Sequence, residues 1–163
     1  MDLLSKLEVF GRTVKRRYPY INCGGCAVYA SALIQSLTEM GIGAHAAVCN
    51  EDSTMEDIKF NSIDEIRSGK PRNARQWNYV GLDFDHVITE FLYEGKMYLC
   101  DSDIIQTSCD SFDGYTVLDG RLDPEEIILV ANDADGDWNH QFNRKLIPEI
   151  HQLFKREFGV TIQ

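Results

Sequence analysis

The chain has 163 residues, of which 44% are hydrophobic and 26% are charged. This composition fits a globular protein with one well-packed core and excludes an intrinsically disordered chain. The formal net charge of -10 makes nucleic acid and anionic membrane surfaces poor partners, because both would be repelled. No stretch approaches the roughly 18 apolar residues that a membrane span needs, so we expect a soluble protein.

The cysteine content predicts a reducing compartment. Five cysteines make an odd number and lack the regular spacing of a secreted disulfide framework. Residues 1–19 mix charged with apolar side chains and have no cleavage site of small residues, so they do not resemble a signal peptide. We therefore expect a cytoplasmic protein with at least one free thiol.

The first third of the chain predicts two helices and a strand. Residues 2–17 have the pattern of an amphipathic helix. The segment Ala27–Met40 contains no Gly or Pro, and Gly41 stands where a helix C-cap is expected, so this segment predicts an apolar helix. Ala44–Cys49 then predicts a short strand, whose small apolar residues suit the centre of a sheet.

The middle of the chain predicts an insertion followed by a hairpin. Residues 50–76 are polar and poorly periodic, which is typical of an insertion that either covers a site or is solvated. Trp77–Phe84 predicts a strand. Asp85–Tyr93 and Lys96–Asp101 form the clearest hairpin, with Glu94-Gly95 as its two-residue turn.

The last third of the chain predicts one more strand, Ile127–Val130, and a helical end. Trp138–Ile147 and Pro148–Phe158 are both expected to be helical, and the proline either begins a second helix or kinks a continuous one. We find no repeat and no linker, so residues 1–163 predict a single α+β domain. The expected architecture is a central helix packed on a small antiparallel sheet, with flanking terminal helices.

A cysteine stands where the second helix is expected to begin, in the sequence Asn22-Cys23-Gly24-Gly25-Cys26. Cys26 would lie beside unpaired backbone N–H groups and the positive end of the helix dipole, which stabilise a thiolate. The glycines would leave the sulfur open to a substrate, and the N–H of Cys26 could hold an oxyanion. The competing interpretation is a buried core cysteine, because Cys26 shares an apolar stripe with Ala30 and Leu33.

The hairpin brings a histidine close to two aspartates. If Tyr93 pairs with Lys96, His86 lies opposite Asp103 and diagonal to Asp101, with all three on one face. A carboxylate that accepts a hydrogen bond from the ring would fix its tautomer and stabilise the imidazolium of a general base. This register favours Asp103, while twist or a bulge brings Asp101 into reach. Alternatively, these side chains only satisfy one another at the end of a strand.

The runs NCGGCAVYASALIQSLTEMGIGAHAAVC and DHVITEFLYEGKMYLCDSD resemble the transglutaminase-like superfamily of papain-like thiol enzymes. The resemblance covers roughly residues 20–103. It lies in a Gly-Cys-x-x-Ala helix, a small strand after a Gly-Ile turn, a strand that begins with His, a turn with Gly and a strand that ends in Asp. Family members usually have an aromatic residue after the His, whereas Val87-Ile88 follow here.

The resemblance implies a papain-like fold and a triad of Cys26 as nucleophile, His86 as base and Asp101 as the acid that orients the base. Asp103 competes for the last role, and Tyr20 is a candidate for a second oxyanion donor. The implied activity is that of a cysteine peptidase, amidase or deamidase, acting on a peptide or protein through a thioester and without a cofactor. The alternatives are an amine acyltransferase of the same fold and a non-catalytic binding or inhibitory module.

Three metal or redox interpretations are weaker. Cys23-x-x-Cys26 could be half of a zinc site or a redox dithiol, but no second paired motif follows it, and no strand is predicted before it. Asp133, Asp135 and Asp137 have the spacing of a calcium loop, but Arg144 stands where a bidentate Glu is required. We therefore expect no metal site.

Overall fold

The computed structural model describes residues 2–19, 21–22, 25–50, 86–122 and 144–159. Within these residues the chain has three α-helices and a six-stranded antiparallel sheet, which confirms the predicted α+β class. The helices are α1 (Leu3–Arg17), α2 (Cys26–Glu39) and α5 (Ile147–Phe158), the last preceded by the 3-10 turn η1 (Arg144–Leu146). The strands are β1 (Ala44–Asn50), β2 (His86–Tyr93), β3 (Lys96–Cys100), β4 (Ile105–Thr107), β5 (Ser111–Phe112) and β6 (Tyr115–Leu122).

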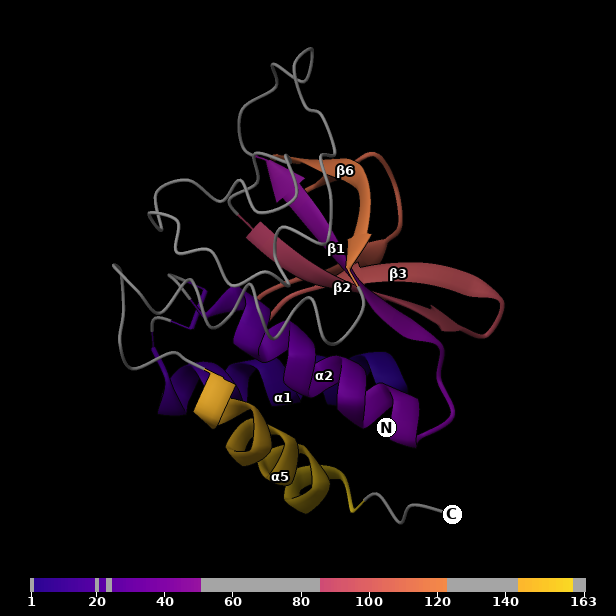
Figure 1. The fold of residues 1–163 in the computed structure, drawn as a ribbon. Helices are drawn as coiled ribbons and strands as arrows, with labels where there is room; N and C mark the ends of the chain where they lie inside the picture. Colours follow the sequence, from indigo (N-terminus) through magenta and orange to yellow (C-terminus); the bar gives the residue numbers. More distant parts are fainter. Residues whose placement is uncertain (1, 20, 23–24, 51–85, 123–143, 160–163) are drawn as a thin grey trace.

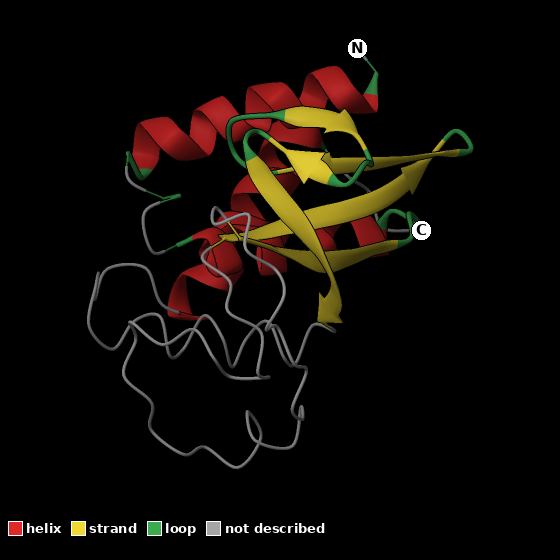
Figure 2. Cartoon of the chain, turned by 90° about the horizontal axis from the view of Figure 1, so that it is seen from above, coloured by secondary structure: helices red, strands yellow, loops and turns green. Residues whose placement is uncertain are grey.

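The sheet is strongly curved, and the helices lie together on one side of it (Figure 1). Its strands follow the order β4-β3-β2-β1-β6-β5. Strands cross at steep angles in the view of Figure 2, as the twist of a curved sheet requires. The sheet is therefore larger than the small one that the sequence predicted.

Each face of the sheet has its own apolar core, because side chains alternate between the faces along each strand. On the helix side, Val48 of β1 and Val87 of β2 pack in one cluster with the buried faces of the helices. On the other side, Ile88, Leu99 and Phe112 belong to a smaller cluster inside the curved sheet. The two clusters therefore lie on opposite faces of the sheet.

Helix α2 is the central helix of the predicted architecture. Most of its side chains are buried, and it packs against both the sheet and α5. Its end is a Schellman motif, in which the N–H groups of Gly41 and Ile42 donate to the carbonyls of Thr38 and Leu37, each at 2.9 Å. The φ of Gly41 is 79°, a conformation that glycine adopts without strain. The prediction that Gly41 caps this helix is confirmed.

An aromatic cluster joins the three helices. Phe10 of α1 stacks on Tyr29 of α2 with ring centroids 5.8 Å apart, and it meets Phe154 of α5 edge to face at 5.0 Å. Phe158 lies 4.7 Å from Phe154 and extends the cluster. Among the described helices, none combines the length and the apolar character that crossing a membrane requires.

The β2–β3 hairpin has the predicted turn. Glu94 and Gly95 both have positive φ, 50° and 78°, as in the type I′ turn that matches the twist of a two-residue hairpin. Tyr93 pairs with Lys96, so the predicted register is confirmed.

The hairpin ladder nevertheless stops before it reaches His86. Its last pair is Thr89 with Cys100, after which β3 ends and the chain turns toward β4. The prediction that Asp103 lies opposite His86 is therefore wrong, because Asp103 has already left the strand.

Strands β4, β5 and β6 were not predicted, because their sequences are short or contain polar and glycine residues. β4 pairs with β3, β5 pairs with β6, and β6 pairs with β1, where Val117 lies opposite Cys49. These long-range pairs extend the hairpin into a sheet.

Several predicted elements lie outside the described residues. They are the strands Trp77–Phe84 and Ile127–Val130, and the greater part of the helix Trp138–Ile147. Pro148 lies in the first turn of α5, so of the two roles that the sequence left open it has that of a helix start.

Candidate active site

Cys26 is the first residue of α2, and the helix has no side-chain cap at this end. Gly25 is the N-cap residue, so the backbone N–H groups of the first helical turn have no capping side chain to bind. Cys26 is 3% exposed and belongs to the helix-side core. The thiol is thus buried, as the core-cysteine interpretation expected, and it also lies at the electropositive end of a helix.

His86 and Asp101 lie at the ends of neighbouring strands and bind one another. Nε2 of His86 is 2.9 Å from Oδ2 of Asp101. The other carboxylate oxygen, Oδ1, accepts the N–H of Asp103 at 2.7 Å and the N–H of Ile104 at 2.9 Å. Both oxygens are therefore engaged, and the carboxylate is fixed in the orientation that meets the ring.

The ring of His86 also stacks on aromatic side chains from strands that the sequence did not reveal. Tyr115 of β6 lies 5.0 Å away, centroid to centroid, with an angle of 30° between the planes. Phe112 of β5 lies 6.4 Å away at 27°. These two aromatic residues hold the plane of the imidazole, and no local sequence signal linked them to His86.

Cys26 lies near the same imidazole and influences its pKa. Burial by itself lowers the pKa of His86, but hydrogen bonds to Asp101 and Cys26, together with the negative charges of both groups, raise it to about 10. Nε2 is the ring nitrogen that Asp101 engages. The structure therefore brings together Cys26, His86 and Asp101.

Two other buried groups near the site, Cys100 and Tyr29, have pKa values raised by burial. Burial raises the pKa of Cys100, and the charge of Asp101 raises it further, so this thiol stays protonated at neutral pH. Burial also raises the pKa of Tyr29 well above its ordinary value. Cys49, which is buried and forms no disulfide bond with a described residue, is the partner of His86 across the β1–β2 ladder.

Asp103 is not part of this arrangement. It forms an ion pair with Lys15 of α1 and accepts a hydrogen bond from Nδ2 of Asn22 at 2.7 Å. Asp103 thus ties the β3–β4 turn to α1 and to the segment before α2. Asn22 was not singled out in the sequence, because its link to the turn depends on the tertiary fold.

Some predicted features of the site fall on residues that the structure does not describe. Tyr20, the candidate oxyanion donor, and Cys23, the first cysteine of the Cys-x-x-Cys pair, lie outside the described residues. Among the residues that it does describe, no group of three or more His, Cys, Asp or Glu could hold a metal ion.

No protein-family model, curated protein or solved structure matches this chain. The interpretation of the site therefore depends on the chemistry of its own residues.

Proposed function

We propose that the protein is a cysteine-dependent acyl hydrolase of the transglutaminase-like kind, with a papain-like core. The observation that carries this proposal is that the imidazole of His86 is hydrogen-bonded to the carboxylate of Asp101 and lies near enough to Cys26 for that group to raise its pKa. A nucleophile, a base and a group that orients the base are the parts of a thiol triad. The antiparallel sheet and the buried central helix support the same assignment.

The proposed reaction starts from an ion pair. With a pKa of about 10, His86 is an imidazolium at neutral pH. In the proposed reaction the sulfur of Cys26 acts beside it as the nucleophilic thiolate. The thiolate attacks the carbonyl carbon of an amide, and the carbonyl π electrons move to oxygen, where backbone N–H groups of the first turn of α2 stabilise the oxyanion. The imidazolium then gives its proton to the leaving nitrogen, and a thioester forms on Cys26.

Water completes the proposed cycle. The now neutral His86 removes a proton from water, the hydroxide attacks the thioester carbonyl, and the thiolate leaves with its electron pair as the carboxylic acid forms. Asp101 stabilises the imidazolium each time it appears, which is the role that its fixed carboxylate favours. The proposed substrate is an amide of a peptide or protein.

We also place the protein in the cytoplasm. The four cysteines that the structure describes, Cys26, Cys49, Cys100 and Cys109, form no disulfide bonds with one another. Free thiols persist where glutathione and thioredoxin keep the environment reducing, which supports this location.

Alkylation at mildly acidic pH tests the proposed thiolate. An ordinary thiol is less than about 1% ionised at pH 6, so a thiolate held in an ion pair should react more than about tenfold faster than N-acetylcysteine with iodoacetamide. The folded protein is labelled first and then digested. We expect mass spectrometry of its peptides to show rapid labelling of Cys26 and slow labelling of Cys100. The exposed Cys109 serves as the internal measure of reagent access.

Two variants make this experiment decisive. His86→Gln should abolish the rapid reaction of Cys26, and Asp101→Asn should slow it, while the labelling of Cys109 stays the same in both. Labelling of Cys26 that is as slow as that of Cys100 in the wild-type protein would instead favour the non-catalytic binding module. Rapid labelling that survives His86→Gln would reject the triad.

A further inference from the structure

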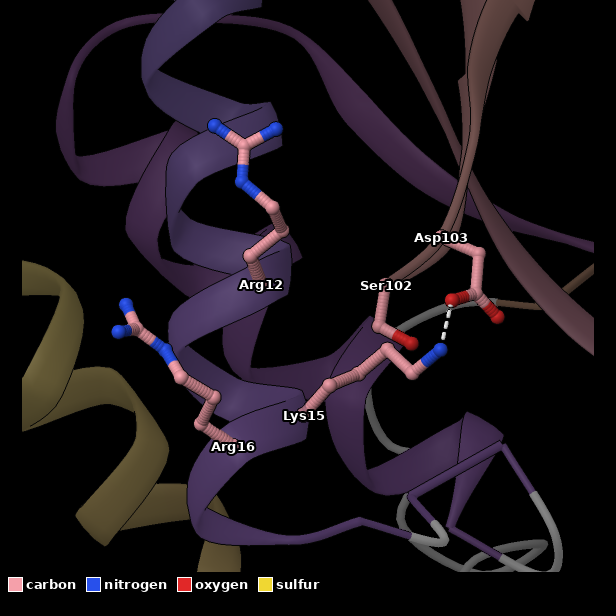
Figure 3. A pocket seen from close by; sticks show the side chains of 5 residues that line it. All are labelled: Arg12, Lys15, Arg16, Ser102 and Asp103. Atoms are coloured by element: carbon pink, nitrogen blue, oxygen red, sulfur yellow. Dashed lines mark hydrogen bonds and ion pairs between the residues drawn. The ribbon is translucent and has the colours of Figure 1, made fainter.

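A basic pocket lies on α1, beside the turn between β3 and β4 (Figure 3). It is lined by Arg12, Lys15 and Arg16 of the helix and by Ser102 and Asp103 of the turn. Its volume of about 480 Å³ is that of a site for a small molecule. The pocket is separate from the residues that contact the Cys26 thiol.

Two arginines of the pocket have no acidic partner among the residues that the structure describes. Neither Arg12 nor Arg16 forms an ion pair with a residue that the structure describes. They are four positions apart on one helix, so they lie on the same face and repel one another. The chain has 26 acidic residues and 16 basic ones, so unpaired guanidinium groups are not explained by a shortage of carboxylates. Together they give this part of an acidic protein a local positive potential.

Ser102 contributes a buried hydroxyl group to the same pocket. The residue is 4% exposed, and its Oγ is buried with no hydrogen-bond partner among the described residues. In Figure 3 this oxygen is directed toward the side chain of Lys15. Buried polar groups are nearly always hydrogen-bonded in folded proteins, so an unpartnered hydroxyl in a basic pocket indicates a missing acceptor.

Lys15 is held by an internal carboxylate that it can exchange for a ligand. Its ammonium group pairs with Asp103, and each of these side chains is 40% exposed. Exposed ion pairs of this kind are weak, so a competing anion can displace the partner. Asp103 would keep its hydrogen bond from Asn22 after the exchange.

We propose that this pocket binds the phosphate group of a small molecule, held by Arg12, Lys15, Arg16 and Ser102. Three cations and one carboxylate leave two positive charges, which match the charge of a phosphate monoester near neutral pH. Guanidinium groups bind phosphate oxygens with two parallel N–H donors, and the serine hydroxyl supplies a neutral donor. The acidity of the whole chain disfavours a polynucleotide as the source of the phosphate. The proposal is independent of catalysis at Cys26.

Titration of the full chain with inorganic phosphate and with glycerol phosphate tests this site. At pH 7.5 and constant ionic strength, backbone amide NMR signals should move in the last two turns of α1 and at residues 102–103. Arg16→Gln should weaken binding at least about tenfold, because it removes a charge-assisted hydrogen-bond donor. The matched control is Lys6→Gln, which removes one charge from α1 outside the pocket and should leave the affinity within about twofold.

Asp103→Asn gives a change in the opposite direction. It removes the internal competitor for Lys15, so phosphate should bind several-fold more tightly. If Arg16→Gln and Lys6→Gln weaken phosphate binding equally, the proposed pocket is rejected in favour of a diffuse effect of surface charge. Weaker or unchanged phosphate binding in Asp103→Asn would show that phosphate does not replace Asp103 at Lys15. Tighter binding of a short duplex DNA than of glycerol phosphate would reject a small molecule as the ligand.

Discussion

At the scale of single residues, His86 stands between two groups that each favour its charged form. Burial opposes that charge, and an isolated imidazole in this position would have a pKa below its ordinary value of 6.5. Asp101 and Cys26 reverse the direction and raise the pKa to about 10. The ring therefore carries a proton across the neutral range, and its charge depends on both neighbours.

The protonation state of His86 can be followed by NMR of ring-labelled protein. We predict that the ring protons of His86 titrate with a midpoint near pH 10, with the charged form below that pH and the neutral form above it. Asp101→Asn removes a hydrogen bond and a negative charge, so the midpoint should fall by about one to three pH units. In a Cys26→Ala, Asp101→Asn double variant only burial remains, and the midpoint should fall below 6.5.

Asp103→Asn is the matched control for this titration. It changes a carboxylate two residues away that binds Lys15 and Asn22 instead of the ring. The midpoint of His86 should stay within about half a pH unit of its wild-type value. A fall as large as that caused by Asp101→Asn would show that general charge, and not the contact with Asp101, sets the protonation of the ring.

At the scale of elements, α1 approaches the β3–β4 turn so closely that residue 11 must be glycine. A Cβ atom on Gly11 would collide with the backbone carbonyl of Ser102, which cannot move without displacing the turn. Alanine normally stabilises a helix interior by roughly 1 kcal/mol relative to glycine, so this position reverses the usual preference. The contact places the turn that carries Asp101 against α1.

We predict that Gly11→Ala lowers the free energy of unfolding by about 1–3 kcal/mol, because the added methyl group overpacks a backbone contact. The same variant should slow the alkylation of Cys26, since the displaced turn carries Asp101 out of position. Urea denaturation measures the first effect. Glu8→Ala, at an exposed position of α1, should change stability by less than about 0.5 kcal/mol. A Gly11→Ala protein that is more stable than wild type would contradict the close approach.

The β2–β3 turn offers a stabilising substitution. Glu94 is an exposed residue with a φ of 50°, a conformation in which asparagine is more favourable than glutamate. Glu94→Asn should raise the free energy of unfolding by about 0.5–1 kcal/mol, measured by urea denaturation. Glu94→Gln removes the same charge but keeps the backbone preference of a long side chain. If both variants gain equally, charge and not turn geometry is responsible.

At the scale of the whole molecule, the last described helix belongs to the same core as the first two. Phe154 of α5 is fully buried against Phe10, so it connects the end of the chain to its beginning. Phe154→Ala should lower the free energy of unfolding by about 3–5 kcal/mol, which denaturant titration can measure. Leu92, which is 48% exposed on β2, is the control, and its replacement by alanine should have a small effect. Similar losses in both variants would contradict a core that α5 completes.

The elements that could be predicted from sequence are those that local chemistry determines. Gly41 ends α2 because glycine suits the conformation that its motif requires, and Glu94-Gly95 sets the register of the hairpin. The preference for Asp101 over Asp103 followed from resemblance to a family motif. The simple extension of the hairpin register gave the wrong partner, because the ladder ends at Cys100.

The features that could not be predicted depend on contacts between distant segments. Strand β6 contains Asp119 and Gly120, which are uncommon in strands, and it forms through pairing with β1. The stacking of Tyr115 on His86 depends on that pairing. The contact of Cys26 with His86 likewise requires α2 to pack on β2, which helical periodicity alone does not specify.

The pairing of Cys49 with His86 has a consequence for how such a chain can evolve. The polypeptide leaves β1 and enters β2 at neighbouring points, so residues 51–85 connect two strands that are already partners. A connection of this kind can be lengthened, shortened or exchanged without moving either strand, because the entropy of loop closure grows slowly with length. The strand residues on either side of this connection, Cys49 and His86, stay paired whatever sequence lies between them. The connection and the sheet can therefore change in sequence independently of one another.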